Sequence, residues 1–174
     1  MNNPGFITAL GLFVCMFILH ELEEWNIVQW YYRHYVDLPA ITARSTRTWI
    51  LFIVVVGIIW YLIAALPSDP SFAAYVLFPA IALTLQNAFQ HLWWQFSFEG
   101  YAPGIVTALL LLIPTGLGLT VWIIREHYAA TWYIALCLIA TLPGLIQTVR
   151  AGNRMAPFIR GINLLGIKLA RMVP

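Results

Sequence analysis

The sequence contains few charged residues, and their scarcity limits the kind of protein it can encode. Charged side chains make up 9% of the 174 residues, whereas they make up about 25% of an average soluble domain. Together with a hydrophobic content of 61%, this excludes an ordinary soluble domain and indicates an integral membrane protein. The formal net charge of +2 is too small to indicate nucleic-acid binding, so no nucleic-acid partner is expected.

Cysteines and long polar segments are also scarce. Cys15 and Cys137 both lie in apolar runs, which predicts buried thiols and argues against a disulfide framework. No long polar or low-complexity segment is present to connect a second domain, so residues 1–174 are expected to form one membrane-embedded helical domain. The first apolar run has no basic region before it and no cleavage pattern, so we interpret it as a retained helix.

Apolar runs of about 20 residues, the length that crosses a bilayer core, recur along the chain. They predict an all-α polytopic membrane bundle with about five transmembrane helices and a C-terminal amphipathic basic helix. The predicted spans are residues 6–32, 49–66, 72–96, 105–124 and 132–149, followed by an interfacial tail at 157–173. Pro114 and Pro143 lie inside the last two spans, where they are expected to permit kinks.

Basic residues are distributed unevenly over the predicted loops. Arg33, Arg44, Arg47 and the basic residues of the tail fall on one side of the membrane, and Arg125 falls on the other. By the positive-inside rule, this predicts a multi-pass protein of the inner (plasma) membrane with its N-terminus outside and its C-terminus in the cytoplasm.

One cluster of ionisable residues interrupts the first apolar run, at His20-Glu21-Leu22-Glu23-Glu24-Trp25. A charged group at bilayer depth costs about 2 to 4 kcal/mol, so it normally faces the protein interior and has a function. On a helix, His20, Glu23 and Glu24 project from one face, while Glu21 points about 100° away. The first three side chains are therefore candidate site residues.

The third predicted span carries a second polar stripe, whose members recur at steps of three and four residues and share one helix face. They are Thr84, Asn87, His91 and Gln95. The first and third spans cross the membrane in the same direction, so a rise of about 1.5 Å per residue places His20 and Asn87 at similar depth. His91 lies one turn further on, near the level of Glu24. We therefore expect the two stripes to meet in the cytoplasmic half of the bundle.

Two imidazoles and two carboxylates predict a metal centre formed by His20, Glu23, Glu24 and His91. This donor set favours zinc, with iron or manganese as the alternatives for a dinuclear site. Glu23 is the candidate general base, and Asn87 is the candidate orienting or oxyanion group. A metal-free network of protonated acids and imidazoles is the alternative arrangement. The sequence leaves open whether three further residues belong to the site: Glu21, Gln147 and Arg150.

Several functions are compatible with such a centre. A metal-dependent membrane enzyme, such as a zinc-dependent hydrolase or a lipid-modifying enzyme, would act on a lipid or a membrane-soluble small molecule. The alternative is a small transporter or a proton- or ion-coupled channel that uses the same residues as a relay, which interrupted spans at Pro114 and Pro143 would suit. A third reading is a scaffold whose polar cluster fixes helix register. The oligomeric state is not determined by the sequence.

The segment His20-x-x-Glu23-Glu24-Trp25 resembles the defining motif of the HXXEE family of small bacterial membrane proteins. The resemblance extends to Asn87-Ala88-Phe89-Gln90-His91 and to Tyr101-Ala102-Pro103-Gly104. It implies that His20, Glu23 and Glu24 are the motif histidine and glutamates, and that His91 is the separate histidine of the family. It also implies a membrane enzyme or metal-binding protein, without an established reaction.

Overall fold

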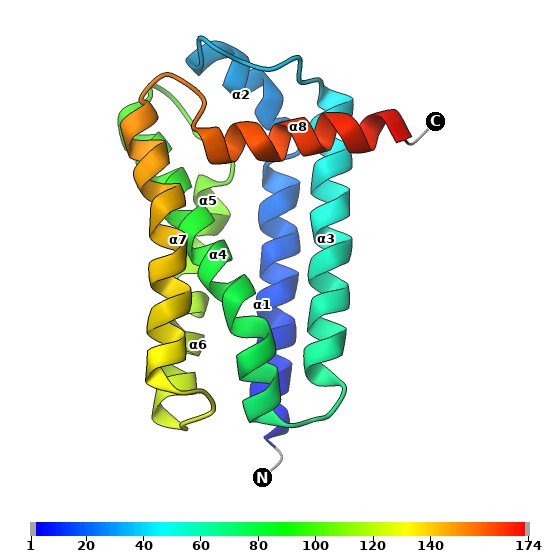
Figure 1. Cartoon of the computed structure of the whole chain (residues 1–174), viewed down its shortest axis with the longest axis vertical. Coiled ribbons are helices and arrows are strands. Elements are labelled where there is room, and N and C mark those ends of the chain that lie inside the picture. Colours follow the sequence, from blue (N-terminus) through cyan, green and yellow to red (C-terminus); the bar gives the residue numbers. More distant parts are fainter. Residues whose placement is uncertain (1–2, 173–174) are drawn as a thin grey trace.

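The computed structural model describes residues 3–172, which fold into an all-α bundle (Figure 1). Five helical segments are long and apolar enough to cross a membrane, which confirms the predicted class. They are α1 (Pro4–Glu23), α3 (Ala43–Ala65), α4 (Pro70–Ser97), the continuous run of α5 (Ile105–Thr107), η1 (Ala108–Leu112) and α6 (Ile113–Arg125), and α7 (Thr131–Ala151). The last three agree with the predicted spans to within two residues.

The first span is shorter than predicted, because its helix ends at Glu23 instead of continuing to residue 32. A turn at residues 24–26 separates α1 from α2 (Ile27–His34), which lies at the end of the bundle away from the N-terminus (Figure 1). Asn26 precedes α2, and its Oδ1 accepts a hydrogen bond from Arg47 Nη2 at 2.8 Å. This contact with α3 helps to hold the turn, and a count of apolar residues cannot detect it.

α3 begins at Ala43, six residues before the predicted start of the second span. Two residues cap it reciprocally: Ser45 N–H donates to Thr42 Oγ1 at 3.1 Å, and Thr42 N–H donates to Ser45 Oγ at 2.9 Å. The helix therefore extends beyond its apolar run and brings Ser45 and Thr46 into the buried part of the bundle.

A π-helical turn, η1, lies just before Pro114 in the fourth span. Proline has no N–H to donate to the preceding turn, and the Ile113 N–H bonds instead to the Ala108 carbonyl five residues back. The kink expected at Pro114 thus takes the form of a π turn. Pro143, by contrast, lies inside an uninterrupted α7.

The bundle has two apolar clusters, one on each side of the polar centre along its length. The larger cluster packs α1 against α4 and α6 and includes Phe6, Leu77 and Phe78. The smaller one packs α2 against the end of α4 and includes Trp30 and Trp94.

The expectation that both thiols are buried is wrong for Cys15, which is exposed on the outside of α1 because its helix turns that face away from the core. Cys137 is half-buried.

The C-terminal tail forms α8 (Pro157–Met172), which crosses the α2 end of the bundle and packs on α3 (Figure 1). Gly166 allows this close approach, because a Cβ there would lie 2.8 Å from the Ser45 carbonyl oxygen. Asp37, in the loop after α2, holds the N-terminal end of α8. Its Oδ1 accepts from Met155 N–H at 2.8 Å, and its Oδ2 pairs with Arg160 Nη2 at 2.7 Å.

We expect the docking of α8 to weaken in acid. The Met155 amide and, after it, Arg160 lower the pKa of Asp37 from its ordinary 3.8. Because the folded-state pKa is the lower one, the stabilisation is complete above the unfolded-state pKa and is lost as the pH falls through the folded-state pKa. A spin-label distance between α3 and α8 should therefore broaden as the pH falls below the ordinary aspartate pKa of 3.8.

Asp37→Asn should show the same broadening at about pH 7. Asp69→Asn is the matched control: Asp69 caps α4 near the opposite end of the bundle, where asparagine caps equally well, and the α3–α8 distance should stay narrow. A narrow distance in Asp37→Asn would contradict the role given to this carboxylate.

Candidate metal centre

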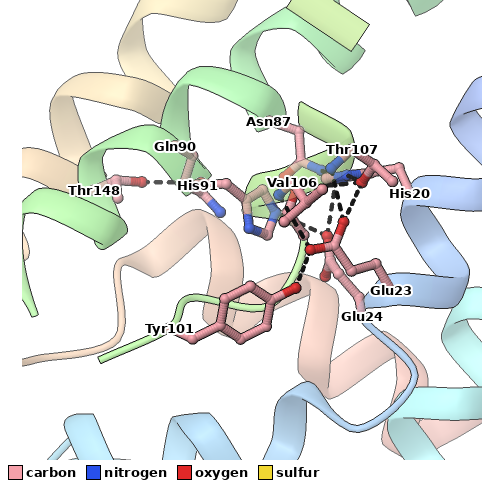
Figure 2. Close-up of polar contacts among 11 residues, drawn as sticks. His20, Glu23, Glu24, Asn87, Gln90, His91, Tyr101, Val106, Thr107 and Thr148 are labelled. Atoms are coloured by element: carbon pink, nitrogen blue, oxygen red, sulfur yellow. Dashed lines mark hydrogen bonds and ion pairs between the residues drawn. The ribbon is translucent and has the colours of Figure 1, made fainter. Parts of the chain in front are cut away.

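Three side chains converge in the half of the bundle next to α2: His20 of α1, Glu24 in the turn after α1 and His91 of α4 (Figure 2). His20 Nε2 lies 3.1 Å from Glu24 Oε1, and His91 Nε2 lies 2.8 Å from the same oxygen. Both imidazoles are fully buried, and the Glu24 side chain is 12% exposed. One ligand atom from each residue lies within 4.8 Å of the other two. Two imidazoles and a carboxylate at this spacing have the donors that a single divalent metal ion requires.

The atoms of this group retain unused hydrogen-bonding capacity. Among the residues that the structure describes, Glu24 Oε1 and both ring nitrogens of His91 are buried and have no hydrogen bond of acceptable geometry. A buried polar atom without a partner costs about 1 to 3 kcal/mol. Glu24 Oε1 and the His91 nitrogens are atoms that can ligate a metal, and they have no other partner in the part of the chain that the structure describes. This arrangement suits a bound ion better than a closed hydrogen-bond network.

Thr107 holds His20 in one tautomer. The Thr107 hydroxyl donates its single hydrogen to Glu23 Oε2 at 2.5 Å, so its oxygen accepts from His20 Nδ1 at 2.8 Å. Nδ1 therefore carries the hydrogen, and Nε2 presents its lone pair toward Glu24 and toward Asn87 Nδ2, which lies at 3.0 Å. A histidine that ligates a metal through Nε2 requires this tautomer.

Glu23 is engaged by the start of the fourth span instead of by the two imidazoles (Figure 2). Its carboxylate accepts hydrogen bonds from Val106 N–H at 3.1 Å, from Thr107 N–H at 2.8 Å and from the Tyr101 hydroxyl. The two amides are free donors in the first turn of a helix, so Glu23 caps that helix from another part of the chain. Burial, and after it the bond to Glu23, raises the pKa of Tyr101, so its hydroxyl remains a donor at neutral pH.

The loop of residues 98–104 closes one side of the centre. Gln95 braces it, because Oε1 accepts from Ala102 N–H at 3.1 Å and Nε2 donates to the Gly100 carbonyl at 3.3 Å. At the end of the loop Gly104 has a φ of +91°, and a Cβ there would lie 2.7 Å from His91 Cε1 and 2.9 Å from His20 Cε1. Glycine is therefore required for the backbone to contact both imidazoles.

The remaining candidates from the sequence have different surroundings. Asn87 lies beside His20, so the polar stripe of α4 does meet that of α1. Glu21 is 6% exposed and lines the same cavity as Glu24. Gln147 ties α7 to α8 by accepting a hydrogen bond from Phe158 N–H at 3.2 Å, and Arg150 is exposed on α7.

Sequence reasoning did not identify Thr107 or Gly104 as part of this site. Thr107 is one of three threonines in an apolar span, with Thr115 and Thr120, and nothing in the sequence distinguishes it from the other two. Gly104 belongs to the Tyr101-Ala102-Pro103-Gly104 segment that carries part of the family resemblance, but its contact with two imidazoles requires the folded loop.

A family model described as "Protein of unknown function with HXXEE motif" matches residues 11–119, more than half of the chain. The chain belongs to the HXXEE family. In this HXXEE chain the motif residues divide between two neighbouring places, since His20 and Glu24 meet His91 while Glu23 meets Thr107. The matched region includes every residue of the centre and of the 98–104 loop, and it ends before α7 and α8. No curated protein and no solved structure matches the chain.

We expect Gly104→Ala to disturb both imidazoles, because the new methyl group would lie within 2.9 Å of each ring at a φ that disfavours alanine. Gly100→Ala is the matched control, with a φ of +84° and nothing within 4 Å of its Cβ. In thermal or denaturant unfolding, the free energy of unfolding should fall further in Gly104→Ala than in Gly100→Ala, by about 2 kcal/mol. An equal loss of unfolding free energy in both variants would mean that backbone strain alone causes it. That result would contradict the close contact between Gly104 and the two imidazoles.

Proposed function

We propose that this protein is a membrane-embedded, metal-binding enzyme whose ligands are His20, Glu24 and His91. The observation that carries the proposal is the convergence of their ligand atoms within 4.8 Å, at a buried place where Glu24 Oε1 and the His91 nitrogens lack other partners. Two imidazoles and one carboxylate make up a ligand set found in catalytic zinc sites, which keep a further position open. Zinc is therefore the favoured ion, with iron or manganese as alternatives.

The residues around these ligands have separate roles in the proposal. Zinc in such a site supplies Lewis-acid activation of water or of a carbonyl group, which suits a hydrolase or a lipid-modifying enzyme. Asn87, next to His20, can orient a polar group of the substrate. Glu23 is a positioning residue that acts on His20 through Thr107, because its oxygens are already held by hydrogen bonds from the fourth span.

We infer the orientation from the arrangement of basic residues. α2, the first turn of α3 and α8 carry most of them and lie at one end of the bundle, whereas Arg125 ends α6 at the other (Figure 1). The positive-inside rule then supports an outside N-terminus, and the resemblance to small bacterial membrane proteins supports the bacterial inner membrane. The centre would lie in the cytoplasmic half of the membrane, within reach of a lipid or another membrane-soluble molecule.

Metal analysis tests the proposal directly. The purified wild-type chain should contain about one metal ion per chain, and His91→Ala or Glu24→Ala should remove most of it, because each change deletes a ligand of the set. His127→Ala is the control: it removes an exposed imidazole in the turn between α6 and α7, at the opposite end of the bundle, and metal content should not change. A metal-free wild type with pH-dependent ion flux in vesicles would support the transporter instead. Metal content that is unaltered in all three variants would contradict the assigned ligands.

The link from Glu23 to the centre has its own test. Thr107→Val removes the hydroxyl between Glu23 and His20 Nδ1 but keeps the side-chain shape, so zinc affinity should fall about 10- to 100-fold. Thr107→Ser retains a hydroxyl and should bind zinc like the wild type. Competition with a chelator of known affinity measures both. Wild-type affinity in Thr107→Val would contradict the positioning role.

A further inference from the structure

A cavity of about 410 Å³ adjoins the centre and extends between α1, α3, α4 and α8. This volume falls in the range of about 300 to 1,000 Å³ that small-molecule sites occupy. Glu24 and Asn87 belong to both the cavity and the centre. A molecule in the cavity would therefore contact the group that is proposed to bind the metal.

The cavity is long, and its lining changes from partly polar at one end to apolar at the other. On α3 its lining runs from Ser45 to Trp60, which corresponds to about 22 Å of helix. Near α8 the lining includes the polar residues Glu21, Glu24 and Asn87. Toward the middle of the bundle it is formed by apolar residues such as Phe17, Val56 and Leu77. An elongated molecule with one polar end and one apolar end matches this gradient.

The cavity reaches the lipid-facing surface between α3 and α4. Phe52 of α3 and Leu83 of α4 both line it, and they are 44% and 46% exposed on the outside of the bundle. These two helices diverge from the turn that joins them, and α8 crosses at their far end (Figure 1). Since both residues lie in membrane-spanning helices, the opening faces hydrocarbon instead of water.

The polar end of the lining offers hydrogen-bonding side chains, since the carboxylates of Glu21 and Glu24 can accept hydrogen bonds and the Asn87 amide can both donate and accept them. The cavity lining contains two carboxylates, Glu21 and Glu24, and no lysine or arginine. This charge disfavours an anionic head group and suits an uncharged one that bears hydroxyl and ester groups.

We propose that the cavity binds a single-chain amphiphile with an uncharged hydroxyl- and ester-bearing head, of which a monoacylglycerol is the simplest example. The hydrocarbon chain lies between α3 and α4, and the head lies beside Glu24 and Asn87. This inference rests on the proposed function, because it names the substrate class of that same centre.

Photolabelling tests the inference on the full-length protein in lipid nanodiscs. The probes are a monoacylglycerol with a diazirine in its chain, the free fatty acid with the same chain, and the corresponding lysophosphatidylcholine. The monoacylglycerol should label cavity residues such as Val56 and Leu83 most strongly. Ala80→Trp fills the cavity and should reduce this labelling about tenfold, whereas Ala140→Trp, on the exposed face of α7, should leave it unchanged.

Metal content, measured on the same samples, serves as the check of folding. If Ala80→Trp loses metal, Leu83→Trp at the mouth of the cavity takes its place. The inference would be overturned if neither cavity variant reduced labelling by the monoacylglycerol. It would also be overturned if the fatty acid or the lysophosphatidylcholine labelled the cavity as strongly as the monoacylglycerol. Metal binding without labelling would overturn the inference and leave the proposed function intact. Labelling without metal would support the cavity assignment and overturn the proposed function.

Discussion

The Glu24 carboxylate joins α1 to α4 through the imidazoles of His20 and His91, at 3.1 and 2.8 Å. Polar groups inside an apolar bundle face the protein interior, so the polar faces of α1 and α4 turn toward each other at this point. This contact also explains the end of α1, because Glu24 is the capping residue at which the helix stops and the chain turns toward α2. The 98–104 loop then closes against both rings through Gly104.

Adjacent acids in the motif have separate roles because they lie on different sides of the helix end. Glu24 faces the second imidazole, whereas Glu23 caps the fourth span and fixes the tautomer of His20 through Thr107. A free carboxylate beside a metal site is usually considered a base. Here the hydrogen bonds from two amides and two hydroxyls make Glu23 a support for His20, which is a proposed ligand, and they connect the start of the fourth span to the centre.

The centre and the cavity together define the proposed activity. The proposed metal ligands are buried, so a membrane-soluble substrate would need a route to them that does not cross water. In the proposed assignment the opening between α3 and α4 provides such a route from the lipid phase, and Ile159 and Asn163 of α8 line the cavity. The Asp37 contact with Met155 and Arg160 then becomes relevant to function, because it holds α8 in that position.

The sequence by itself determined the five spans, the C-terminal helix and the inward-facing residues His20, Glu24, Asn87 and His91. Hydropathy and helical periodicity are local properties, and a polar group in an apolar span has to face protein. Tertiary structure decided the turn after Glu23, the early start of α3, the engagement of Glu23 by Thr107, the contact of Gly104 and the cavity. Each of these depends on which distant backbone amide, hydroxyl or ring comes within about 3 Å, and residue spacing along one helix carries no information about such partners.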